Sequence, residues 1–230
     1  MYKNIIKYIE NNIILESKAE DLAQILSNIR RTFNILDLVK DILNNEMLCN
    51  QIAANSYFHY NGFDKIILYE SEVCKLRLHI WWGSNIEYKE NVHDHRWNFA
   101  SWIVKGKYIN EIYTDNDNFG NVFSEYHYKP RDRKEKQSYP LEFIRQTKLK
   151  KDRIEELSEG MITKCETGTL HRVKPITGIN TVTLFLQSSS VLSYARVLNQ
   201  ETIIDSDNIQ AISMQPDYLV KQLNKLITIL

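Results

Sequence analysis

The chain of 230 residues carries 29 Lys and Arg against 29 Asp and Glu, so its formal net charge is zero. This balance argues against a nucleic-acid-binding protein, which usually carries a basic face. The sequence also lacks an apolar run long enough to cross a bilayer and a secretory signal at its N-terminus. Three cysteines without CxxC spacing favour a reduced compartment. We therefore expect a cytoplasmic protein with neither a nucleic-acid nor a membrane partner.

Residues 1 to about 55 are predicted to be helical. Apolar residues recur at helical spacing, and neither glycine nor proline occurs before Gly62. Ser17 with Glu20 predicts a cap at the start of the second helix. These helices are expected to pack on the rest of the chain.

The pattern changes after the turn signal Asn61-Gly62, where short runs rich in β-branched and aromatic residues begin. The predicted strands are 65–69, 75–82, 99–106, 108–114, 122–129, 160–166, 171–176 and 181–188. Within 75–82, Arg77 and His79 alternate with apolar residues and so share one face. Many short strands separated by turn residues favour a sandwich or barrel.

Three regions organise the predicted fold, and the composition suggests one structural unit. Residues 1–55 form a helical segment, 56–205 a β-barrel and 206–230 the region of a C-terminal helix that starts after Pro216. The barrel carries a charged insertion at about 130–158, expected to be a loop or hairpin with some helix near 150–158.

The clearest chemical signal is His93-Asp94-His95. On a strand, residues two apart project from the same face, so both histidines could bind one metal ion. Strict alternation would place Phe99, Ser101 and Ile103 on that face too. His171, which follows a glycine turn and opens an apolar strand, is the candidate third ligand. The alternatives are polar residues at a strand start for the pair, and a buried structural histidine for His171.

These spacings resemble the two motifs of the cupin superfamily, small β-barrels of jelly-roll type. The first motif matches at His93, His95 and Gly106, and the second at Gly160, Gly168 and His171. Phe99 stands where the family has a glutamate ligand, Glu166 where it has proline, and Pro175 where it has asparagine. The resemblance thus implies a mainly β jelly-roll fold with helices before and after it, and a three-histidine metal site. Such a site suits Fe(II), Zn(II), Ni(II) or Cu(II).

Within that superfamily, the set resembles the thiol dioxygenases, which include cysteine dioxygenase. The similar stretches are His93-Asp94-His95, residues 170–173 and Trp82-Gly83. This resemblance implies Fe(II) as the cofactor, with zinc or nickel as alternatives. It stops at the strand after His171, where that family carries Ser-x-His-x-Tyr and this chain has Thr183, Phe185 and Gln187. Ala100 stands in place of that family's cross-linking cysteine, so cysteine itself is not expected to be the substrate.

The remaining candidates surround this site. Arg77 is the nearest basic candidate for the carboxylate-binding arginine of the thiol dioxygenases. Arg96 could bind a substrate carboxylate, or it could form a structural ion pair with Asp94 or Glu111. The structural ion pair is favoured. Gln187 is a further candidate contact, Cys165 is expected to be inert, and His59 and His127 are expected at the surface. The predicted substrate pocket is lined by His79, Phe99, Ser101, Thr183 and Phe185.

Three functions remain open. The first is a mononuclear non-haem Fe(II) dioxygenase or oxygenase that uses O2 and acts on a small thiol- or amino-acid-like metabolite. The second is a zinc or nickel cupin that catalyses a redox-neutral lyase, isomerase or rearrangement reaction. The third is a small-molecule-binding cupin without catalysis. A monomer or a homodimer is expected in each case.

Overall fold

Five helices frame the described part of the molecule. The computed structural model describes residues 1–59, 61–83, 90–116, 118–129, 141–201 and 212–230. The helices are α1 (Tyr2–Asn12), α2 (Ala19–Thr32), α3 (Ile35–Leu43), α4 (Glu46–Asn55) and α5 (Pro216–Ile227). The predicted helices before and after the β region are therefore confirmed.

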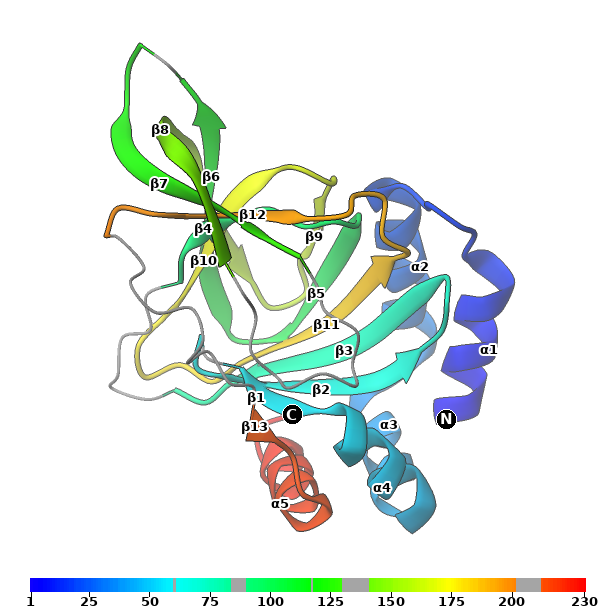
Figure 1. The fold of residues 1–230 in the computed structure, drawn as a ribbon. Coiled ribbons are helices and arrows are strands. Elements are labelled where there is room, and N and C mark those ends of the chain that lie inside the picture. The colour runs from blue at the N-terminus through cyan, green and yellow to red at the C-terminus, as the bar shows by residue number, and fades with distance from the viewer. Residues whose placement is uncertain (60, 84–89, 117, 130–140, 202–211) are drawn as a thin grey trace.

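Thirteen strands in the described ranges form two sheets (Figure 1). Sheet A has the order β13-β1-β2-β3-β11-β5-β9, and sheet B closes on itself in the order β10-β4-β12-β7-β8-β6. Sheet A consists of β1 (Tyr57–His59), β2 (Phe63–Glu70), β3 (Cys74–Trp81), β5 (Phe99–Lys105), β9 (Ile162–Cys165), β11 (Thr181–Ser188) and β13 (Ile212–Ser213). Sheet B consists of β4 (Val92–His93), β6 (Lys107–Asp115), β7 (Asn121–Tyr128), β8 (Leu141–Ser158), β10 (Leu170–Pro175) and β12 (Ala195–Asn199).

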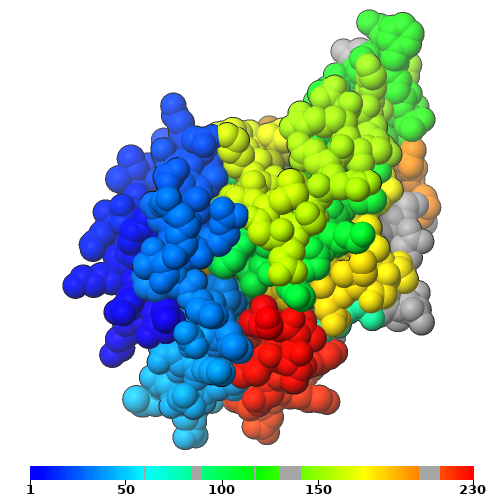
Figure 2. All heavy atoms as spheres, turned by 180° about the vertical axis from the view of Figure 1, so that it is seen from behind, coloured from blue at the N-terminus to red at the C-terminus, as the bar shows by residue number. Residues whose placement is uncertain are grey.

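The largest hydrophobic core lies between sheet A and the helices. Leu78 and Leu184, neighbours on β3 and β11, are fully buried in one cluster with Leu26 of α2 and Leu223 of α5. Figure 2 shows the helical side of the molecule, with α5 beside the N-terminal helices and the end of β6 and start of β7 projecting beyond the body. The helices cover one face of sheet A and leave its other face for sheet B.

Sheet B has a smaller core of its own. Val92, Tyr113, Phe123, Leu149, Leu170 and Leu198 form a buried cluster inside its closed ring of strands. Because side chains alternate along a strand, His93 and His171, the neighbours of Val92 and Leu170, point out of that ring. They face sheet A, where the Phe99 ring lies 5.8 Å from that of His171.

The predicted fold class is confirmed as mainly β with flanking helices, and all eight predicted strands fall on observed ones. The helix expected near 150–158 is wrong, because those residues pair with β6 as part of the 18-residue strand β8. Residues 130–140 of the charged insertion and residues 206–211 lie outside the described residues.

The predicted cap of the second helix is also wrong. Lys18 is the N-cap residue, and its backbone N–H donates to the Asp21 carboxylate at 3.1 Å. Ser17 instead closes the preceding turn, since its hydroxyl donates to the Ile14 carbonyl at 2.9 Å. Among the helices described here, none combines the length and hydropathy that a bilayer crossing demands.

The turn between β5 and β6 requires glycine at position 106. Gly106 has a φ of +77°, and a Cβ there would contact the Asn180 carbonyl and lie 2.8 Å from Thr181 Oγ1. Gly178 has a similar φ of +76° but open space around it. A comparison of alanine substitutions at Gly106 and Gly178 therefore distinguishes the effect of backbone strain from that of steric overlap.

We predict that Gly106→Ala lowers the free energy of unfolding more than Gly178→Ala does. A left-handed alanine costs about 1–2 kcal/mol, which both variants bear. Overlap in a packed turn adds about 1–3 kcal/mol at position 106 alone. Urea unfolding of the two variants measures the difference, and equal losses would contradict this account of the turn.

Candidate metal centre

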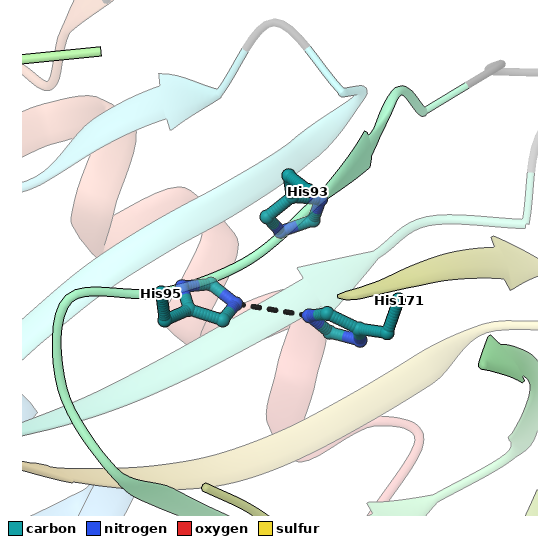
Figure 3. Close-up of side chains that lie close together, drawn as sticks. All are labelled: His93, His95 and His171. Carbon is teal, nitrogen blue, oxygen red and sulfur yellow. Dashed lines mark hydrogen bonds between the residues drawn. The ribbon is translucent and has the colours of Figure 1, made fainter. Parts of the chain in front are cut away.

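Three histidines from two strands and the segment after one of them meet between the two sheets. His93 lies on β4 directly opposite His171 on β10, and His95 follows β4 after the strand has ended. Each offers a ring nitrogen, and these atoms all lie within 4.8 Å of one another. In Figure 3 the three rings point toward a common centre. The structure thus brings together the three histidines singled out in the sequence, although only His93 is on the strand expected for the pair.

The spacing of the nitrogens fits a shared ion. Nε2 of His95 and Nε2 of His171 are 3.0 Å apart, the contact dashed in Figure 3. Two nitrogens about 2.1 Å from one metal ion are about 3.0 Å apart when they subtend a right angle at it. Nitrogen donors that converge in this way suit a divalent first-row transition metal.

Hydrogen bonds orient two of the rings. His171 Nδ1 lies 3.0 Å from Asn110 Oδ1, and His93 Nδ1 lies 3.1 Å from the Asn91 carbonyl oxygen. Both oxygens accept, so each Nδ1 carries a proton, and in a neutral ring Nε2 then keeps the lone pair. That is the ring form in which Nε2 binds a metal.

Burial keeps two of the rings neutral. It lowers the pKa of His95 and of His171 well below the ordinary histidine value, and the nearby His93 adds to the effect. Neutral imidazole is the form that coordinates a metal, so these two side chains need not lose a proton at pH 7.

An apolar group of side chains closes one side of the histidines. Phe99 contacts His95 edge-on at 4.9 Å between ring centroids and stacks on Phe185 at 4.5 Å. Cys165, opposite Phe99 on β9, belongs to the same cluster, and burial raises the pKa of its thiol to about 12. Phe99 therefore lies beside the histidines and offers no fourth donor.

Polar atoms without partners line the same face of sheet A. His79 Nε2, Thr183 Oγ1 and Gln187 Oε1 are buried and have no hydrogen-bond partner among the described residues. His79 lies opposite Thr183, and the buried Ser101 lies opposite Phe185, so all these residues share the face toward the histidines. Buried polar atoms without partners are rare and call for an explanation such as a bound ligand.

Two basic side chains also belong to this face. Arg77 is 5% exposed, and its guanidinium carbon lies 5.3 Å from the centroid of the Phe185 ring. Lys65 lies opposite His79 on β2, and burial, with Arg77 adding to it, lowers the pKa of its amine well below the usual range. Lys65 was not singled out in the sequence. The available signal was its position two residues after Phe63, which places both side chains on one face of the strand.

Two expectations about single residues are wrong. Arg96 makes neither proposed ion pair, because Asp94 accepts from the Arg196 backbone and Glu111 is bound by Arg172, Lys151 and Lys174. The Arg96 guanidinium instead lies over the Trp97 ring, 5.1 Å from its centroid. Its Nε is buried and has no hydrogen-bond partner in the described structure.

The other correction concerns His59 and His127, which were expected at the surface. Both are half-buried. His59 stacks on Phe63 with ring centroids 4.5 Å apart, and His127 stacks on Tyr194 at 3.9 Å.

Comparisons with known proteins give structural similarity alone. No protein-family model matches the chain, and neither does any curated protein. The similar solved structures include an RmlC-like cupin from Shewanella frigidimarina, with 12% identity and a TM-score of 0.34 over 56% of this chain and 78% of that one. DMSP lyase DddQ from Ruegeria pomeroyi has 9% identity and a TM-score of 0.32 over 54% of this chain and 43% of the lyase. Hydroquinone 1,2-dioxygenase from Sphingomonas has 8% identity and a TM-score of 0.35 over 55% and 65%.

We predict that His93→Ala, His95→Ala and His171→Ala each weaken metal binding on the order of 100-fold or more. A binding free energy of about 10–16 kcal/mol for zinc is shared by only a few ligands, so each ligand carries a large part of it. Titration with Co(II), followed by its visible absorption, gives the affinity. His127→Ala is the matched control, since His127 stands apart from the cluster, and loss of binding in that variant alone would contradict the assignment.

Proposed function

We propose that this chain is a mononuclear metal-dependent cupin enzyme, and that it is a non-haem Fe(II) dioxygenase or oxygenase. The observation that carries the proposal is the convergence of three histidine nitrogens, with a phenylalanine rather than a carboxylate beside them. A ferrous ion bound there would supply oxygen chemistry, with positions left for substrate and O2.

The side chains around the site would bind and orient the substrate. Phe99 and Phe185 provide an apolar surface next to His95. His79, Thr183 and Gln187 offer buried polar atoms that lack partners in the described protein. Arg96 Nε adds a buried donor of the same kind. A small polar molecule that binds here would satisfy atoms that otherwise carry a desolvation penalty.

The charges on this face favour an anionic group on the substrate. Lys65 lies opposite His79, and Arg77 is two residues from His79 on the same face of β3. Burial disfavours the charged form of these two basic side chains, and a carboxylate bound beside them would favour that form again. The proposed substrate is therefore a small thiol- or amino-acid-like acid.

A redox-neutral enzyme is the second candidate. Three imidazole donors suit Zn(II) or Ni(II) as well as Fe(II), and His93 and His95 are half-buried. The bound ion would then act as a Lewis acid for a lyase or isomerase reaction.

We predict that the Fe(II)-loaded protein consumes O2 when a small thiol carboxylate is added, and that His93→Ala reduces uptake to background. An oxygen electrode measures the uptake, with the zinc-loaded protein as a parallel control. Turnover that persists under strict anaerobiosis would favour the redox-neutral enzyme. Protein that purifies with zinc and takes up no oxygen with iron would contradict the oxygenase proposal.

We also predict that the protein binds thioglycolate at least tenfold more tightly than its neutral amide. Charge-assisted hydrogen bonds contribute about 1.5–3 kcal/mol, which corresponds to about 10–100-fold in affinity. Lys65→Met and Arg77→Met should each reduce this preference, while Lys105→Met, which removes a surface partner of Glu159, should keep it. Tryptophan fluorescence follows binding because Trp97 lies 5.5 Å from Arg77, and equal affinities for the acid and the amide would refute the anionic substrate.

A further inference from the structure

A chain of hydrogen bonds runs from the candidate metal centre across β10, β6 and β8 to a solvent-exposed arginine. His171 Nδ1 lies 3.0 Å from Asn110 Oδ1, and Asn110 Nδ2 donates to Glu155 Oε2 at 2.9 Å. Arg153 Nε in turn donates to Glu155 Oε1 at 2.8 Å. Asn110 is 7% exposed, whereas the side chain of Arg153 is 58% exposed. The chain therefore links a buried ring to a solvated ion pair.

The register of three strands produces this arrangement. Asn110 on β6 lies directly opposite Glu155 on β8 and opposite Val173 on β10. His171 is two residues from Val173, so it shares a face with Asn110 and is its diagonal neighbour. Side chains at such positions are close enough to contact one another, and the strand pairing alone holds Asn110 between the histidine and the carboxylate.

The donor and acceptor of each hydrogen bond between His171, Asn110 and Glu155 follow from the chemistry of the groups. A carboxylate only accepts, so Glu155 must bind the amide nitrogen of Asn110 and thereby turns the amide oxygen toward His171. That oxygen also only accepts, so His171 must carry its proton on Nδ1. Its Nε2 then carries the lone pair, and this atom lies within hydrogen-bonding distance of His95 Nε2, at 3.0 Å.

We propose that Asn110 and Glu155 are positioning residues for His171, which fix its tautomer and ring orientation in advance of metal binding. This inference rests on the proposed metal site, because its purpose is to direct Nε2 toward the ion. Groups that hold a histidine ligand in this way typically contribute about 10–100-fold to metal affinity. A purely structural role for Asn110 would affect the stability of the fold and leave the tautomer of His171 unchanged.

The experiment compares Asn110→Leu and Glu155→Ala with the wild-type protein. Two-bond ¹H–¹⁵N correlation spectra of the metal-free protein report which nitrogen of His171 carries the proton, and Co(II) titration reports affinity. We expect the wild type to show the Nδ1–H tautomer, and both variants to show a mixture with an affinity lowered about 10–100-fold. Glu156→Ala, an exposed neighbour on β8 opposite Ile109, is the matched control and should change neither.

A double variant tests the polarity of the chain. Asn110→Asp with Glu155→Gln keeps the total charge and reverses the direction of the bond between positions 110 and 155. The aspartate still accepts from His171, and the glutamine amide donates to the aspartate. We expect this variant to restore the tautomer and most of the affinity.

The two proposals fail in different ways. An unchanged tautomer and affinity in Asn110→Leu and Glu155→Ala would overturn the positioning role while the metal site stands. A wild-type protein that binds no metal would overturn the proposed function, and the tautomer measurement would still decide whether Asn110 orients His171. If Asn110→Leu fails to fold, Glu155→Ala provides the same readout from outside the buried position.

Discussion

The placement of β10 between β4 and β6 is the contact on which both halves of the β region depend. Successive side chains of β10 point alternately into the core of sheet B and toward sheet A. Leu170 fills the closed core of sheet B, while His171 faces sheet A. Without this strand, sheet B would be an open sheet with its core exposed, and the two histidines of the segment 93–95 would have no third partner. Structural closure and candidate chemistry therefore arise from the same backbone hydrogen bonds.

Alternating apolar residues were enough to locate the main strands in the sequence, because burial on one face imposes a period of two. Apart from the 18-residue β8, the strands that escaped notice are short, such as β4 with two residues and β12 with five. The segment 150–158 is rich in good helix formers, yet pairing with β6 determines its conformation, since tertiary contacts override intrinsic propensity. The histidines were recognisable because their spacing is unusual. Asn110 and Lys65 were not, because a lone polar residue on a strand reveals its neighbours only once the register is known.

Charge is distributed unevenly in a protein whose formal total is zero. On sheet B, the buried Glu111 binds Arg172, Lys151 and Lys174, and Glu125 binds Arg196 and Arg145, so carboxylates and cations are matched there. On the face of sheet A toward the histidines, Arg77 lies beside the Phe185 ring and Lys65 beside the Tyr57 ring. Burial disfavours the charged form of a basic side chain, and a negatively charged partner nearby offsets that cost. An anionic ligand at the candidate site would therefore reduce the free-energy cost of burying these two basic side chains.

The β4–β10 pairing joins residues 93 and 171, which are far apart along the chain. Contacts of such long sequence separation carry a large loop-closure entropy and tend to form late in folding. In the unfolded chain only the two histidines of the 93–95 segment are near each other, which makes a weak chelate. A metal ion would therefore be acquired by a nearly complete protein and would not nucleate its folding. The order of events would be assembly first and loading afterwards, and because the ion would bind the folded chain more tightly than the unfolded one, loading would raise the free energy of unfolding without being needed to start folding.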